Sequence, residues 1–227
     1  HKGLGHLGPM TDYAVARRNM VLRQLEPNRV HDIRILEAMG SIPREVFAPK
    51  SLASVAYIDE DLEIAPGRYL MEPMVLARLI EALAIEPGDL VLNVGCATGY
   101  AAAVLTQLAG TVVAVESDAD LVTRAGDNLA KVDIDNVAVI EGPLAEGRAD
   151  QGPFAAILID GAVEQVPPAL LAQLAPGGRL ACVVQDGPTG KAMLFSENDG
   201  VLGHRPLFDA SIPPLPGFAR PDVFAFQ

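Results

Sequence analysis

Residues 89–116 constrain the fold most, because they place a glycine turn between two apolar runs of strand length. The first run meets the turn Gly95-Cys96-Ala97-Thr98-Gly99, and an apolar segment of helical length follows. The second run, residues 111–116, ends in Glu116. Glycines let a ligand approach the backbone, and an acid after the second strand accepts hydrogen bonds from ribose hydroxyls. The segment predicts a β-α-β unit with a nucleoside pocket, although the glycine turn alone fits an ordinary strand-turn-helix equally well.

The spacing of the glycines separates two kinds of nucleoside pocket. Dinucleotide enzymes prefer Gly-x-Gly-x-x-Gly, whereas this chain has Ala97 in place of the middle glycine. The spacing resembles that of S-adenosylmethionine (SAM) methyltransferases more closely.

Apolar runs alternate with helical patterns from residue 86 onward, which predicts an α/β fold. Continuous apolar runs indicate strands buried on both faces of a parallel sheet with right-handed crossovers. The expected strands are 90–95, 111–116, 137–141, 154–159 and 178–184, and the expected helices are 98–108, 118–131 and 166–174. Antiparallel edge strands are expected at 191–195, 205–208 and 222–226, and the Pro-rich residues 212–218 are expected to form a loop.

The region before the sheet predicts a helical cap. Helices are expected at 11–25 with Thr11 or Asp12 as N-cap, at 32–39 with Asp32 as N-cap, from Pro43 through Phe47, and from Pro73 onward. Residues 1–9 precede Met10 and are interpreted as left over from expression. Residues 10–227 are expected to form one domain, with the cap and active-site segment in 10–85 and the α/β core in 86–227.

Composition bears on partners and compartment. The 227 residues carry a formal net charge of −12, so a basic face for nucleic acid is not expected. Two cysteines, Cys96 and Cys182, form no disulfide framework and fit a reducing cytoplasm. No apolar run is long enough to span a membrane, and no signal peptide is visible.

Titratable clusters predict no metal site. The acidic residues Asp59, Glu60, Asp61 and Glu63 lack a neighbouring histidine or cysteine and are interpreted as a solvated loop. His31 and His204 are isolated and are assigned no role.

Several unrelated short patterns, in a fixed order from Met20 onward, resemble the protein-L-isoaspartate O-methyltransferase family. The patterns are Met20-Val21-x-x-Gln24-Leu25, Ile42-Pro43-Arg44-Glu45-x-Phe47-x-Pro49, Ala56-Tyr57-x-Asp59, Glu72-Pro73-Met74-Val75 within 67–77, the loop within 91–105, and Leu170-x-x-Gln173-Leu174-x-x-Gly177-Gly178. The resemblance implies a doubly wound, mostly parallel seven-stranded sheet, the Rossmann-like fold of class I SAM methyltransferases.

The resemblance also implies an activity. SAM would donate a methyl group to the side-chain carboxylate of an isoaspartyl residue in a damaged protein or peptide, leaving S-adenosylhomocysteine. The cofactor residues it implies are Asn93, Gly95, Cys96, Ala97, Gly99, Tyr100, Glu116, Ser117, Gly142, Pro143, Leu144 and Asp160. Cys96 is interpreted as a packing residue, and Asp160 either faces the acceptor or caps the following turn.

The chain departs from the family pattern at the acceptor. The family segment Gly-Gln-Thr-Ile-Ser is here Gly67-Arg68-Tyr69-Leu70-Met71, so Met71 replaces a serine that donates a hydrogen bond. Met71, Tyr69 and Arg68 are the catalytic candidates, with Tyr69 or Arg68 as substitute donors. A packed ring and a solvated charge are the alternatives for these two side chains.

Two acids of the family pattern are also absent. Gly142-Pro143-Leu144 replaces Gly-Asp-Gly, and Asn93 replaces the acid before the glycine loop. Because SAM is cationic at sulfur, these losses are expected to weaken its binding. A methyltransferase with another acceptor and a catalytically silent SAM-binding or protein-interaction module remain the alternatives, and side chains filling the cleft would favour the module.

Overall fold

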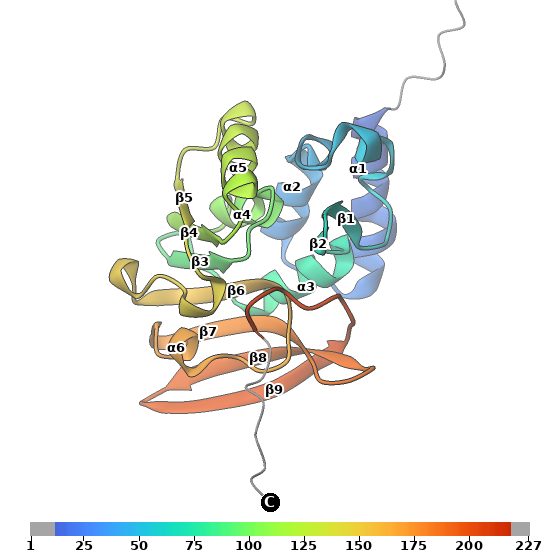
Figure 1. The fold of residues 1–227 in the computed structure, drawn as a ribbon. Helices are drawn as coiled ribbons and strands as arrows, with labels where there is room; N and C mark the ends of the chain where they lie inside the picture. Colours follow the sequence, from blue (N-terminus) through green and yellow to red (C-terminus); the bar gives the residue numbers. More distant parts are fainter. Residues whose placement is uncertain (1–11, 219–227) are drawn as a thin grey trace, which may run out of the picture.

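The computed structural model describes residues 12–218 and contains a seven-stranded sheet of order β5-β4-β3-β6-β7-β8-β9 (Figure 1). The strands from β5 to β7 pair in parallel, and β8 and β9 add antiparallel edges. The bounds are β3 Leu90–Val94, β4 Thr111–Glu116, β5 Val137–Glu141, β6 Phe154–Val163, β7 Leu174–Gln185, β8 Gly190–Asn198 and β9 Val201–Asp209. The mostly parallel seven-stranded sheet is confirmed.

The central strands are mostly apolar because the side chains of each strand pack into two hydrophobic cores, one on each face of the sheet. In β3, Val91 belongs to one hydrophobic cluster, whereas Leu92 and Val94 belong to the other. Successive side chains of a strand point to opposite faces, so both faces of the sheet are covered. The helices on the first face are α1 Tyr13–Met20, α2 Ile33–Ser41, α3 Pro73–Ala82, α4 Tyr100–Thr106 and α5 Ala119–Lys131. The second face packs against α6 Pro168–Leu171 and against Leu215 and Phe218.

The helical cap forms as expected, with differences at its ends. Asp12 and Asp32 cap α1 and α2 by accepting backbone N–H bonds from Val15 and Arg34. The helix expected at 11–25 changes to a π-helical turn at Val21–Leu25, and Thr11 lies outside the described residues. Pro43 immediately precedes the short 3₁₀ helix Arg44–Phe47. Within residues 12–218, no helix is both long and apolar enough to cross a membrane.

The sheet elements differ from expectation mainly in length. β6 continues to Val163 and β7 starts at Leu174, where it pairs with Phe154. The early start of β7 shortens the helix expected at 166–174 to α6, which begins only after Pro167. The edge strands expected at 191–195 and 205–208 are present as β8 and β9, whereas 222–226 lies outside the described residues.

A two-stranded hairpin was not anticipated. β1, Leu62–Ala65, pairs antiparallel with β2, Arg68–Leu70, through a turn in which Gly67 has φ +70°. The strands are too short for the alternation of buried and exposed residues to stand out in the sequence. The hairpin determines which side chains of residues 68–70 lie toward the glycine loop, because alternate residues of β2 point to opposite sides.

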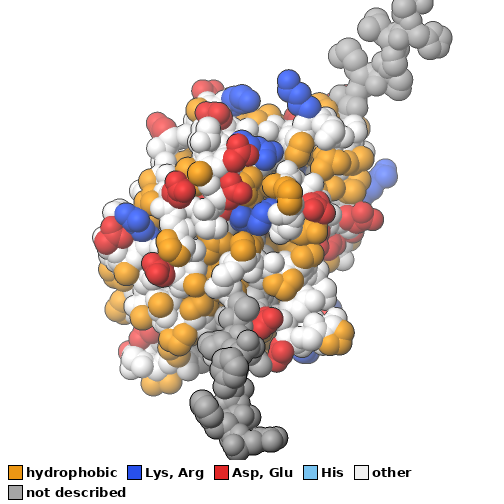
Figure 2. Space-filling model, viewed as in Figure 1, with side chains coloured by type: hydrophobic (Ala, Val, Ile, Leu, Met, Phe, Trp, Pro, Cys, Tyr) orange, Lys and Arg blue, Asp and Glu red, His pale blue; other side chains and the backbone are white. Residues whose placement is uncertain are grey.

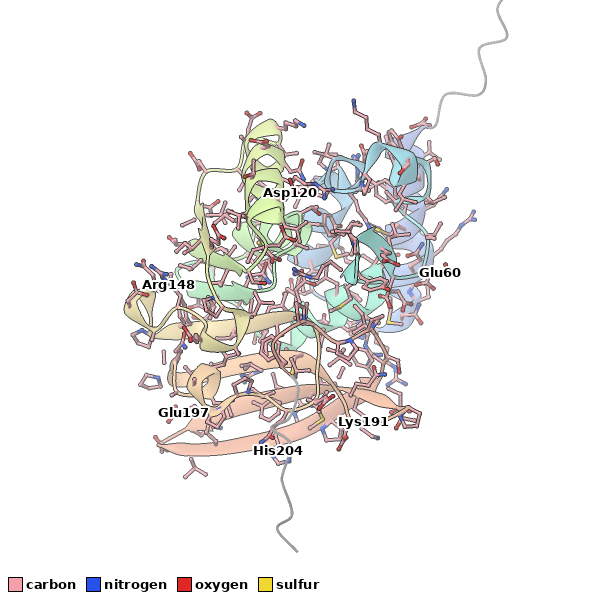
Figure 3. All side chains as sticks on the ribbon, in the orientation of Figure 1. Glu60, Asp120, Arg148, Lys191, Glu197 and His204 are labelled. Carbon is pink, nitrogen blue, oxygen red and sulfur yellow. The ribbon has the colours of Figure 1, made fainter. Side chains whose placement is uncertain are left out.

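Surface charge is mixed on the face shown in Figure 2, where basic side chains lie singly among acidic ones. Glu60 projects at the outer edge of the molecule in Figure 3 and is exposed, as expected for the acidic loop. Asp61 departs from that expectation, because it is partly buried and accepts the backbone N–H of Glu72 at 2.7 Å.

Candidate active site

The glycine loop joins β3 to α4 at the carboxyl edge of the sheet. Gly95 and Gly99 have φ values of +79° and +100°, which L side chains rarely adopt. Ala97 between them also has a positive φ, +50°. The backbone N–H of Gly95 donates to the carbonyl of Val115 at 2.8 Å, which fixes the loop against β4. The predicted strand-turn-helix unit is confirmed.

Glu116 ends β4 beside this loop and is fully buried. Its Oε1 accepts the backbone N–H of Ala97 at 2.9 Å, and its Oε2 accepts that of Asp118 at 3.0 Å. The carboxylate therefore lies where the β-α-β unit needs an acid, and it also shapes the loop.

Arg68 donates to the acceptor positions of Glu116 that the backbone leaves free. Its Nη1 donates to Oε2 at 2.8 Å and its Nη2 donates to Oε1 at 2.5 Å, a bidentate pair. Burial disfavours the charged guanidinium, but hydrogen bonding and attraction from Glu116 outweigh this, so the pKa of Arg68 is raised. The structure thus pairs Arg68 with the proposed ribose acid, and the solvated-charge alternative for Arg68 is wrong.

Leu215, from residues 212–218, covers the glycine loop. A methyl group added at Gly95 would lie 3.2 Å from Leu215 Cδ1, and one added at Gly161 would lie 2.6 Å from its Cγ. The backbone N–H of Leu215 donates to the carbonyl of Ala162 at 2.9 Å. Pro214 forms a parallel bridge with the same residue, so the segment is fastened to the end of β6. Figure 1 shows this red segment returning across the sheet after β9.

Asp160 lies near the carboxyl edge of β6 and is buried. Burial raises its pKa to about 7, against the attraction of Arg68 and Arg44. The attraction of its charge by Arg68 and Arg44 places Asp160 near both of these cations.

Arg44 is a fully buried cation that holds the segment carrying Met71. Its Nη2 donates to the carbonyl of Met71 at 3.0 Å, and its Nε donates to that of Ala56 at 2.6 Å. The guanidinium lies 4.7 Å from the centre of the Tyr100 ring. Sequence reasoning quoted Arg44 only within a family pattern and gave it no role.

The three catalytic candidates do not lie together. Tyr69 turns to the other side of β2 from Arg68, and its hydroxyl donates to Glu63 at 3.3 Å. Tyr69 is therefore a partner of the hairpin in this structure, not a donor beside Arg68. Met71 is buried, with its carbonyl held by Arg44.

The other cofactor candidates fall into an inner and an outer group. Asn93, Cys96, Ala97, Tyr100 and Leu144 are buried, whereas Ser117 and Pro143 are exposed and Gly142 is intermediate. The amide nitrogen of Asn93 donates to the carbonyl of Leu158 at 3.4 Å, and its Oδ1 has no partner among the described residues. Burial raises the pKa of the Cys96 thiol, which fits packing and not nucleophilic chemistry.

No group of three or more His, Cys, Asp or Glu residues within 12–218 is arranged to hold a metal ion. The acidic loop contacts the active-site segment at Glu72. Burial, and then a hydrogen bond with Asp59, raise the pKa of Glu72 to about 7.

The parts of a nucleoside site are present, and in this structure two of them are occupied by side chains of the protein. Each oxygen of Glu116 already accepts two N–H bonds, so its lone pairs are occupied. Leu215 lies where a ligand would approach the backbone of Gly95. A ribose bonded to Glu116 would have to replace Arg68, and a ligand against Gly95 would meet Leu215.

Comparisons with known proteins identify relatives over most of the chain. The protein-L-isoaspartate(D-aspartate) O-methyltransferase family pattern matches residues 16–207. A protein-L-isoaspartate O-methyltransferase of Koribacter versatilis (strain Ellin345) is 39% identical over 208 residues, covering 92% of this chain and 94% of the relative. Protein-L-isoaspartate O-methyltransferase 2 of Anaeromyxobacter sp. (strain Fw109-5) is 42% identical over 179 residues, covering 79% and 73%.

Solved structures agree on the fold. A protein-L-isoaspartate O-methyltransferase superposes with a TM-score of 0.76 at 27% identity, covering 88% of this chain and 66% of that chain. A Plasmodium falciparum protein described as a putative member, solved with S-adenosyl-L-homocysteine, gives a TM-score of 0.73 at 21% identity over 88% and 97%. The class I methyltransferase fold is therefore confirmed, and the chain belongs to the protein-L-isoaspartate(D-aspartate) O-methyltransferase family.

Proposed function

We propose that this chain is a SAM-dependent carboxyl methyltransferase that acts on isoaspartyl side chains of damaged proteins or peptides. The observation that carries the proposal is the family match across residues 16–207, combined with a retained glycine loop and a buried Glu116. SAM, when bound, would supply an electrophilic methyl group. A carboxylate acceptor is ionised at pH 7 and needs no general base, so the protein has to position it and exclude water.

Arg68 is the proposed binding group for the acceptor carboxylate. Met71 cannot donate a hydrogen bond, and the hydroxyl of Tyr69 is directed to Glu63. The guanidinium of Arg68 already binds one carboxylate with both Nη atoms. If a ribose took the place of Arg68 at Glu116, the two Nη donors of Arg68 would be free to bind the carboxylate of an isoaspartyl residue.

The filled glycine loop favours a second candidate, a protein-interaction module that transfers no methyl group. Arg68 and Leu215 occupy the positions that a cofactor needs, as such a module would allow. A methyltransferase with a different acceptor is the third candidate.

The burial of both free cysteines fits a reducing compartment, and we place the chain in the cytoplasm.

Methyl transfer to an isoaspartyl peptide, with its ordinary aspartyl twin as control, tests the proposal. We expect weak transfer to the isoaspartyl peptide alone. Met71→Ser restores a donor beside the acceptor, so transfer should rise roughly tenfold, the scale of one charge-assisted hydrogen bond in the transition state. Met74→Ser, a change at a partly buried methionine on α3, should give no rise.

Two results would count against isoaspartyl transfer. Equal transfer to both peptides would indicate another acceptor. No transfer by the native chain or by Met71→Ser, with cofactor shown to bind, would leave the interaction module as the better account.

A further inference from the structure

We propose that Arg68 and Leu215 form a latch that holds the cofactor site closed until both side chains are displaced. The proposal rests on the function proposed above and adds its regulation. The two side chains come from opposite parts of the chain, β2 and residues 212–218, and they meet over Gly95. An Arg68 nitrogen lies 3.7 Å from the position of an added Gly95 methyl group, beside Leu215.

In the polar half of the latch, Arg68 competes with a ribose for the carboxylate of Glu116. A ribose needs acceptor lone pairs on Glu116, and Arg68 occupies them with two hydrogen bonds. The pair is buried, with Arg68 at 6% and Glu116 at 0% side-chain exposure, so water screens it little. Breaking it leaves a buried charge on each side unless new partners arrive. The cofactor supplies partners for Glu116, and an acceptor carboxylate would supply them for Arg68.

The apolar half of the latch fills the space that glycines 95 and 161 leave open. Leu215 reaches both positions and closes the carboxyl edge between β3 and β6. Its segment is tied by the bond from Leu215 N–H to Ala162 and by a bond from Ile212 N–H to Gln185 Oε1 at 3.2 Å. These are few hydrogen bonds, so displacing Leu215 mainly has to overcome its burial in the apolar core that it shares with Phe218.

A closed site lowers apparent affinity in proportion to the fraction of molecules that are open. The apparent dissociation constant equals the intrinsic value divided by that fraction. Weakening either half of the latch raises the open fraction and must tighten cofactor binding. An ordinary binding residue would give the opposite result when removed.

Calorimetry with S-adenosylhomocysteine tests the latch on the native chain, Arg68→Met, Leu215→Ala and the double variant. We expect each single variant to bind roughly tenfold or more tightly than the native chain, and the double variant more tightly still. Arg34→Met is the matched control for Arg68, because Arg34 pairs with Asp32 at the surface. Leu174→Ala is the control for Leu215, because both leucines are 8% exposed and Leu174 starts β7 beside Phe154, at the amino edge of the sheet.

A further variant shows whether the gain comes through Glu116. In the Arg68→Met background, Glu116→Ala should weaken binding again by at least tenfold, because the ribose acceptor is lost. If Leu215→Ala does not fold, Leu215→Val shortens the same contact and replaces it in the comparison.

The outcomes separate the latch from the function. Native affinity equal to that of Arg68→Met and the Leu215 variant would overturn the latch and leave the cofactor assignment intact. Weaker binding by Arg68→Met would also overturn it, since Arg68 would then be an ordinary ligand contact. No binding by any variant, all folded, would overturn the SAM-dependent function and the latch with it.

Discussion

Arg44→Met is expected to lower the free energy of unfolding by about 3 kcal/mol or more. The guanidinium is fully buried and donates to the carbonyls of Met71 and Ala56. A hydrogen bond to a charged group contributes about 1.5–3 kcal/mol, and relief of the cation's burial offsets part of the loss. That burial is evident in the lowered pKa of Arg44.

Urea denaturation measures this loss, with Arg34→Met as the matched control. Arg34 makes its pair with Asp32 at 39% side-chain exposure, so its loss should cost less than about 1 kcal/mol. Similar costs for the two variants would mean that Arg44 does not hold the Met71 segment. Arg44→Lys should recover only part of the loss, because an ammonium cannot span both carbonyls as a planar fork does.

Asp160→Asn is expected to stabilise the protein by an amount that grows with pH. Burial raises the pKa of Asp160 to about 7, from 3.8 in an unperturbed chain. Between these values the folded state holds a proton that the unfolded state releases. The native chain therefore loses stability as pH rises through this window, and the full cost is present above about pH 7. At about 1.4 kcal/mol per pH unit, that cost is on the order of 4 kcal/mol.

The isosteric amide removes this titration while keeping the size of the side chain. Thermal unfolding at pH 4.5, 6 and 8, values chosen to span roughly the window above, should show a small gain, then a larger one, then the largest. A constant difference across these values would mean that Asp160 is not a buried acid of raised pKa. A gain that shrank with rising pH would mean that Arg68 and Arg44 stabilise the charge more than burial disfavours it.

The sheet was predictable because its signals are local. The run at 90–95, which ends in Gly95, and Gly99 after it indicate strand, turn and helix within a dozen residues. Element ends were less predictable, because they depend on neighbours. β7 begins at Leu174 only because Phe154 offers a pairing partner there.

The glycine loop and Glu116 could be predicted from the sequence, but the side chains that lie against them could not. Glu116 and the glycine loop lie where the β-α-β pattern places them. The face on which Arg68 lies follows from a three-residue strand that the sequence does not reveal, so the sequence could not separate Arg68 from Tyr69. Leu215 is 54 positions beyond Gly161, and no periodicity links a leucine in a Pro-rich loop to a distant glycine.

The position of Leu215 along the chain has a consequence for synthesis. A chain emerges from the ribosome amino end first, at about 5–20 residues per second. The glycine loop, Glu116 and β6 are therefore all available before residues 212–218 have been made. A nascent chain can therefore form the Arg68–Glu116 pair before Leu215 exists, so a ligand that arrives then has only this pair to displace.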